Sequence, residues 1–193
     1  MRRFVMGLGL LLALSAPAAA QSCGSTGDGF EQWKQAYAAR AAAEGVGKKG
    51  LAALAKTYYA KATIKADRSQ HAFKLSLDQF MQKRGASAIV AQGKRLKAEN
   101  ARLFASIETR YGVPAGPLIA IWGMETAFGS FMGKQNTLSA VATLAYDCRR
   151  PDYFRDQLNA ALKLVDDGVL TSSSVGAMHG EVGQTQFLPM NVL

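Results

Sequence analysis

The chain has 193 residues, which is enough for one sizeable domain or for one domain with a short appendage. Hydrophobic residues make up 49% and charged residues 19%, a composition that is typical of globular proteins and argues against a disordered tail. Twenty-three Lys and Arg against 14 Asp and Glu give a net charge of +9, which favours an anionic partner but does not choose between nucleic acid, a membrane and an acidic polymer.

The first twenty residues predict an export signal. Two arginines follow Met1, an uncharged apolar run covers residues 4–14, and a proline among small residues covers 15–20. This order is typical of a secretory signal that is cut after an A-x-A pattern, here after Ala20. The apolar run of roughly 11 residues is much shorter than the about 20 needed to span a bilayer, which argues against a membrane anchor. We therefore expect a signal peptide at 1–20 and a mature chain, residues 21–193, that lies in the periplasm without a transmembrane anchor.

The rest of the sequence predicts one helix after another, because apolar residues recur three and four positions apart. In the first such stretch Phe30, Trp33, Tyr37 and Ala41 fall on one face. We expect helices at 28–41, 49–59, 73–84, 87–111, 117–128, 138–146 and 152–165, and a polar loop at 60–72. No stretch alternates convincingly between apolar and polar residues as a strand does, so the predicted class is all-α.

Cys23 and Cys148 are the only cysteines, which excludes a disulfide scaffold and a four-cysteine zinc site. Both lie in the exported part of the chain, so we expect a disulfide between them. Two unpaired thiols are the alternative. Cys23 also leaves a lipid-modified N-terminus open, although the two residues before it fit a lipid-attachment pattern poorly.

The most informative stretch is the expected helix at 117–128, in which Glu125 is the only charged residue. Ile121, Trp122 and Phe128 lie one helical turn away, so we expect a helix that is buried on nearly every face. A carboxyl group among apolar side chains is suited to donate a proton near neutral pH, because loss of hydration disfavours its charged form. The alternative is a buried glutamate held by Arg or Lys in a structural ion pair, and this stretch alone does not choose between the two.

A glycine-rich stretch at 176–189 carries the other candidate site residues. Gln184 and Gln186 each offer a donor and an acceptor, which suits sugar hydroxyl and acetamido groups. Phe187 is suited to stack on a sugar face or to fill the core, and the core is the favoured interpretation. His179 is a candidate base or ligand, but no second histidine stands at metal-ligand spacing, so we expect no metal site.

Several motifs together resemble the lytic murein transglycosylase B family (glycoside hydrolase family 103). The stretch ETAFG at 125–129, with MG at 132–133, is similar to the catalytic motif of that family, and GQTQFLP at 183–189 is similar to its substrate-cleft motif. Weaker similarity lies at 66–70, 110–114 and 137–145. The resemblance implies a lysozyme-like helical transglycosylase domain. The catalytic domain of the family continues beyond the position of Pro189, so we expect residues 21–193 to hold its N-terminal and central part, with the C-terminal part missing.

The resemblance also implies an activity. The family cleaves the β-1,4 bond between N-acetylmuramic acid and N-acetylglucosamine in peptidoglycan and leaves a 1,6-anhydro ring, as part of cell-wall turnover. Glu125 is then the sole catalytic acid/base, whereas ordinary glycosidases use a pair of carboxyl groups. The implied substrate-binding residues are Gln186, foremost, with Gln184, Glu181 and Phe187.

The implied partner is the glycan strand of peptidoglycan, and we expect no cofactor. We also expect a monomer that binds no nucleic acid. Two rival functions stay open: a non-catalytic protein that binds peptidoglycan, and an exported nucleic-acid binder, for which net charge is the sole support.

Overall fold

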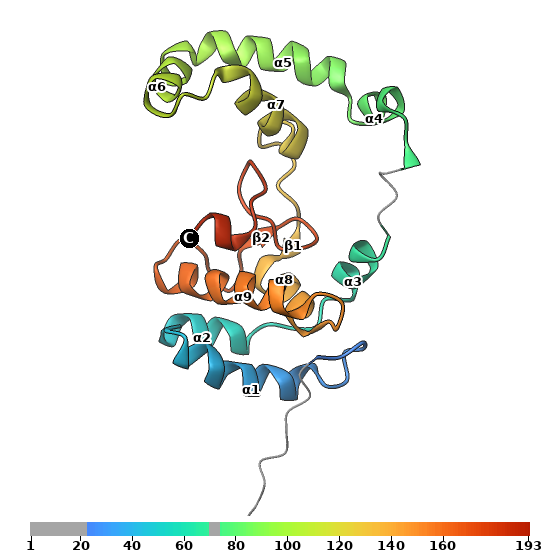
Figure 1. Cartoon of the computed structure of the whole chain (residues 1–193), viewed down its shortest axis with the longest axis vertical. Coiled ribbons are helices and arrows are strands. Elements are labelled where there is room, and N and C mark those ends of the chain that lie inside the picture. Colours follow the sequence, from blue (N-terminus) through green and yellow to red (C-terminus); the bar gives the residue numbers. More distant parts are fainter. Residues whose placement is uncertain (1–22, 70–73) are drawn as a thin grey trace, which may run out of the picture.

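Two groups of helices make up the part of the chain that this computed structural model describes, residues 23–69 and 74–193 (Figure 1). The elements in chain order are α1 (Phe30–Ala43), α2 (Lys48–Ala55), α3 (Lys61–Asp67), α4 (Leu77–Lys83), α5 (Ala86–Glu99), α6 (Ala101–Tyr111), α7 (Ala115–Thr126), β1 (Gln135–Asn136), α8 (Thr137–Tyr146), α9 (Pro151–Asp166), β2 (Val175–Gly176) and the 3₁₀ helix η2 (Pro189–Asn191). The class is all-α, as the sequence predicted. The expected signal peptide at 1–20 lies outside the described residues.

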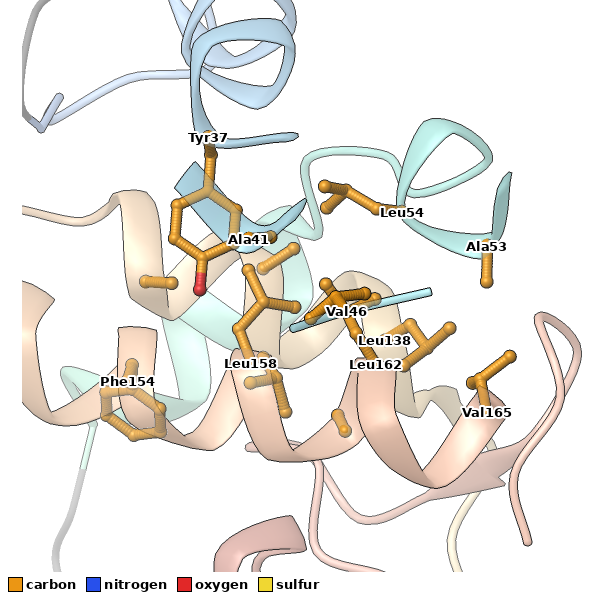
Figure 2. Packing of buried hydrophobic residues seen from close by; sticks show 14 of the residues in the cluster. Tyr37, Ala41, Val46, Ala53, Leu54, Leu138, Phe154, Leu158, Leu162 and Val165 are labelled. Atoms are coloured by element: carbon orange, nitrogen blue, oxygen red, sulfur yellow. The ribbon is translucent and has the colours of Figure 1, made fainter. Parts of the chain in front are cut away.

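Helix α8 lies at the centre of the larger group, which also holds α1, α2, α3 and α9. Every residue of α8 is buried. Leu158 and Leu162 of α9, four positions apart, belong to the same core cluster as Tyr37 of α1 and Leu54 of α2 (Figure 2). The core therefore forms where the apolar stripes of these amphipathic helices meet.

The smaller group, α4 to α7, lies in the chain between α3 and β1 and has a core of its own. That core contains Phe104, Ala115 and Ile119. Helices α5 and α7 approach closely at Gly123, where a Cβ atom would lie 2.5 Å from Ile89 Cγ2. Because this core is small, much of the group stays exposed, and α4 has no buried residue at all.

A disulfide joins the N-terminal end of the described chain to the larger group. Cys23 and Cys148 are bonded, with their Cα atoms 5.0 Å apart. Beside this bond the Gly24 N–H donates to the Tyr146 carbonyl oxygen at 2.9 Å. The predicted pairing is confirmed, and it leaves no free sulfur on Cys23 for lipid attachment.

Two expectations about local structure are wrong. The loop predicted at 60–72 contains α3, whose buried residues, Thr63 and Asp67, are polar and so leave no apolar periodicity to read. The single helix predicted at 87–111 is broken at Asn100, which ends α5 and begins α6 with φ −112° and ψ 27°.

Two other helices differ from their predicted boundaries. The helix predicted at 73–84 begins only at Leu77, because Ser76 and Gln79 form a capping box. The helix predicted at 49–59 ends at Ala55. The sequence predicted no strand, yet β1 and β2 pair as a two-residue antiparallel ladder that joins the segments before α8 and after α9.

Candidate active site

Helix α7 carries Glu125 on an exposed side. The buried residues of α7 are Ala115, Ile119, Gly123 and Thr126. Ile121 and Glu125, one turn apart, are exposed, because α7 packs mainly on α5 and α6 and this side stays open. The expectations of a helix buried on nearly every face and of a sheltered Glu125 are therefore wrong. The side chain of Glu125 has no hydrogen bond or ion pair with any described residue, so the alternative of a structural ion pair has no support either.

Glu125 lines a groove of about 500 Å³. The other lining residues are Arg84, Ala177, Glu181, Gln186, Phe187, Leu188 and Asn191. The groove thus brings together four predicted site residues from two distant stretches of the chain. The core position favoured for Phe187 is wrong, because 49% of this residue is exposed.

A tight turn presents Gln186 and Phe187 to the groove. The backbones of Val182 and Phe187 exchange two hydrogen bonds, of 2.8 and 3.1 Å. Between them Gln186 has a φ of 53°, an uncommon conformation for a residue with a side chain, and its Nε2 donates to the Gly183 carbonyl oxygen at 2.8 Å. Residues held in such conformations often belong to functional sites.

Gln184 has a different position from Gln186. Its Oε1 accepts the Trp122 Nε1–H at 2.5 Å, and its carbonyl oxygen accepts from the Thr126 hydroxyl at 2.6 Å. That hydroxyl also accepts the Gly129 N–H at 3.0 Å. Gln184 therefore ties the turn to α7 and does not line the groove beside Glu125.

His179 holds the carboxylate of Glu181. Its backbone N–H donates to Oε2 at 3.0 Å, and its ring Nδ1 lies 3.2 Å from Oε1. Burial opposes the charge of Glu181, but the hydrogen bonds from His179 and from the backbone of Glu181, together with the charge of His179, outweigh burial and hold the pKa of Glu181 below 4.5. The hydrogen bond to Glu181 raises the pKa of His179 above 6.5, against the effect of burial. Glu181 is therefore a fixed anion at the groove and a poor proton donor.

Asp67 of α3 lies on the far side of His179. Its side chain is 1% exposed and accepts hydrogen bonds from the guanidinium groups of Arg149 and Arg150. His179 Nε2 is buried, has no hydrogen-bond partner among the described residues, and lies 3.9 Å from Asp67 Oδ1. Helix α3, the start of α9 and the loop after β2 meet at this carboxylate, so the network fixes the position of Glu181.

Arg84 and Asn191 line the groove but were not singled out from the sequence. Arg84 is the C-cap of α4, and Asn191 is the last residue of η2. The fold positions Asn191 through non-local contacts of η2 with α9, such as the hydrogen bond from Met190 N–H to Gln157 Oε1, at 2.9 Å. In the sequence, the feature that could have indicated this contact is Gln157, a polar residue on the apolar face of α9 that is buried in the structure.

The described residues contain no cluster of three or more His, Cys, Asp or Glu placed to hold a metal ion. In the same parts of the chain, no helix has the length and apolar character needed to cross a membrane.

The family model described as the transglycosylase SLT domain matches residues 29–193. The chain belongs to this family. Membrane-bound lytic murein transglycosylase B of Escherichia coli (strain K12) is 37% identical over 81 residues, which are 41% of this chain and 22% of that protein. The resemblance stated from the motifs is therefore confirmed.

Solved structures of family members agree in fold. SltB3 from Pseudomonas aeruginosa, in complex with NAG-NAM-pentapeptide, matches with a TM-score of 0.72 at 36% identity, over 83% of this chain and 43% of that one. Slt35 from Escherichia coli, in complex with bulgecin A, matches with a TM-score of 0.66 at 22% identity, over 81% and 51% of the two chains, which supports the fold alone. The chain spans about half of the length of these relatives, and it has the lysozyme-like helical transglycosylase fold that the motifs implied.

Proposed function

We propose that this protein is a peptidoglycan lytic transglycosylase. It cleaves the β-1,4 bond between N-acetylmuramic acid and N-acetylglucosamine and leaves a 1,6-anhydro ring. The observation that supports this most is the position of Glu125, free of any partner among the described residues, in a groove with Gln186 and Phe187, in a chain of the transglycosylase SLT domain family.

Glu125 performs both proton transfers. Its carboxylic acid first protonates the glycosidic oxygen, and the C1–O bond to the leaving N-acetylglucosamine breaks. The carboxylate then takes the proton of the muramic C6 hydroxyl as that oxygen bonds to C1, which restores the acid. No water is consumed, so no second carboxylate is needed to activate one, unlike in a hydrolase.

The exposure of Glu125 in the free protein is consistent with this role. A glycan strand in the groove covers the carboxyl group and removes water from it, so the shelter from water that the sequence led us to expect comes from the bound substrate. The removal of water also favours attack by the C6 hydroxyl over hydrolysis.

The other groove residues bind and orient the sugar. The half-exposed ring of Phe187 stacks on a sugar face, and Gln186 donates to or accepts from hydroxyl and acetamido groups. Glu181, held ionised by His179, stabilises the positive charge that develops at C1 or accepts the acetamido N–H. Gln184 acts through the backbone that it ties to α7.

The site of action that we propose is the periplasm, which an export signal at 1–20 makes accessible. Removal of that signal takes away two arginines and no acidic residue, so the net charge falls from +9 to +7. A basic protein suits a polymer that is rich in carboxylates. The expectation of a monomer stays a prediction.

Digestion of purified sacculi tests the proposal. The chain with its natural residue should release anhydro-muropeptides, Glu125→Gln should release none while it stays folded, and Glu108→Gln, a change at an exposed glutamate of α6, should behave as the unchanged chain. Retained release by Glu125→Gln would refute the role of Glu125. Binding to sacculi without any soluble product would instead support the rival function of a peptidoglycan-binding protein.

A further inference from the structure

The ring of His179 lies between two carboxylate groups from distant parts of the chain. Its Nδ1 is 3.2 Å from Oε1 of Glu181, in the loop after β2, and its Nε2 is 3.9 Å from Oδ1 of Asp67, in α3. Only 21% of the His179 side chain is exposed, and Nε2 is buried without a hydrogen-bond partner in the described part of the chain. Water therefore does little to solvate the nitrogen that lies nearest to Asp67.

These surroundings favour a ring that carries a proton on both nitrogens. A neutral ring that donates from Nδ1 to Glu181 leaves a lone pair on Nε2, beside the negative charge of Asp67. An imidazolium instead has an N–H on each side, and both carboxylates attract its charge. The hydrogen bond to Glu181 accordingly raises the pKa of His179 above 6.5 against the effect of burial, and the charge of Asp67 adds to the rise.

Arginine side chains weaken this attraction but do not cancel it. Arg149 and Arg150 both donate to Oδ1 of Asp67, and the charge of Arg150 lowers the pKa of His179. Asp67 still raises that pKa, so its attraction remains after it has paired with the arginines. The charged groups about the ring are thus Glu181 from its own loop, Asp67 from α3, and the two arginines from the segment that leads into α9.

We propose that His179 is a positioning residue for cleavage: as an imidazolium between Asp67 and Glu181, it holds the Glu181 carboxylate in the orientation that the developing charge at C1 requires. This inference rests on the proposed function and adds to it a residue that does not touch the sugar, because Glu181 lines the groove and His179 does not. The support behind the ring is firm, since Asp67 is 1% exposed and is held by two guanidinium groups.

Kinetics on soluble, uncross-linked glycan strands test the inference. His179→Asn removes the charge and shortens the side chain on the side of Asp67. The value of kcat should fall about tenfold, as expected for the loss of one charge-assisted hydrogen bond. KM should change by less than about twofold, because the groove itself keeps its lining. Glu108→Gln, at an exposed glutamate of α6, should leave both constants unchanged, and circular dichroism should show each variant folded.

A double variant shows whether His179 acts through Glu181. Glu181→Gln should lower kcat at least as much as His179→Asn does, and the two changes together should lower it no further than Glu181→Gln alone. An unchanged kcat in His179→Asn, or an additive loss in the double variant, would overturn the inference and leave the proposed function standing. An unchanged chain that releases no anhydro product would overturn both.

A proton NMR titration of the imidazole C–H groups needs neither activity nor a change at His179. One of the two histidines of the chain should titrate with a midpoint above pH 6.5. Glu181→Gln should lower that midpoint, because it removes the partner of Nδ1, whereas Glu108→Gln should not move it. A midpoint that Glu181→Gln leaves in place would overturn the inference.

Discussion

Replacing Thr126 with valine is expected to loosen the contact between α7 and the turn that carries Gln186. The Thr126 side chain is almost completely buried, with 1% of the residue exposed. Its hydroxyl donates to the Gln184 carbonyl oxygen at 2.6 Å and accepts the Gly129 N–H at 3.0 Å. Valine has nearly the same shape but makes neither bond. At about 1 kcal/mol for each hydrogen bond lost, the free energy of unfolding should fall by about 2 kcal/mol.

Urea denaturation followed by circular dichroism measures this change. Thr126→Ser is the matched control, since it keeps the hydroxyl and loses one methyl group, and it should cost less than about 1 kcal/mol. Release of anhydro-muropeptides by Thr126→Val should also fall, because one of the two hydrogen bonds by which Gln184 ties the turn to α7 is then lost. A valine variant as stable as the unchanged chain would refute the reasoning that this hydroxyl joins α7 to the turn that carries Gln186.

Three further predictions concern pH, the disulfide and one glycine. The raised pKa of His179 means that its contribution to stability is complete below pH 6.5 and is lost as the pH rises through the raised value, while the lowered pKa of Glu181 means that its contribution is complete above pH 4.5 and is lost on acidification. His179→Asn should therefore cost about 1 kcal/mol in urea denaturation between these two values and less at a pH well above the raised pKa of His179, and a cost independent of pH would contradict the pairing. Reduction of the bond between Cys23 and Cys148, 125 residues apart, should lower the free energy of unfolding by at most about 5 kcal/mol, and an unchanged melting temperature in reductant would argue against the bond. Gly133→Ala should destabilise the chain, because φ is +89° and the new Cβ would lie 2.0 Å from the Gly176 carbonyl oxygen; normal stability would show that Gly133 and β2 are not this close.

The amphipathic helices of the larger group could be predicted from the sequence, because their buried residues are apolar and regularly spaced. Helix α1 is the clearest case, with Phe30, Trp33 and Tyr37 buried as expected. Helix α3 could not be found in this way. Its buried Asp67 is stabilised by Arg149 and Arg150, more than eighty residues away, and no local sequence pattern predicts such distant partners.

The sequence predicts several residues of the site but not how exposed they are or which other residues lie beside them. Glu125, Gln186 and Phe187 belong to motifs that stand out in the sequence, and the fold brings them to one groove. The exposure of Glu125 could not be foreseen, because an apolar stretch does not reveal which of its faces lacks a neighbour. Arg84 was missed since its place beside Glu125 depends on how α4 packs on α5 and α5 on α7.

The direct test of the central claim is the fate of the oxygen at muramic C1. Sacculi should be digested in water enriched in oxygen-18, and the new muramic ends analysed by mass spectrometry. We predict 1,6-anhydro ends without the heavy isotope, since the C6 hydroxyl of the substrate closes the ring and Glu125 only transfers protons. Reducing ends that carry oxygen-18 would show that water attacks C1, and they would contradict the account.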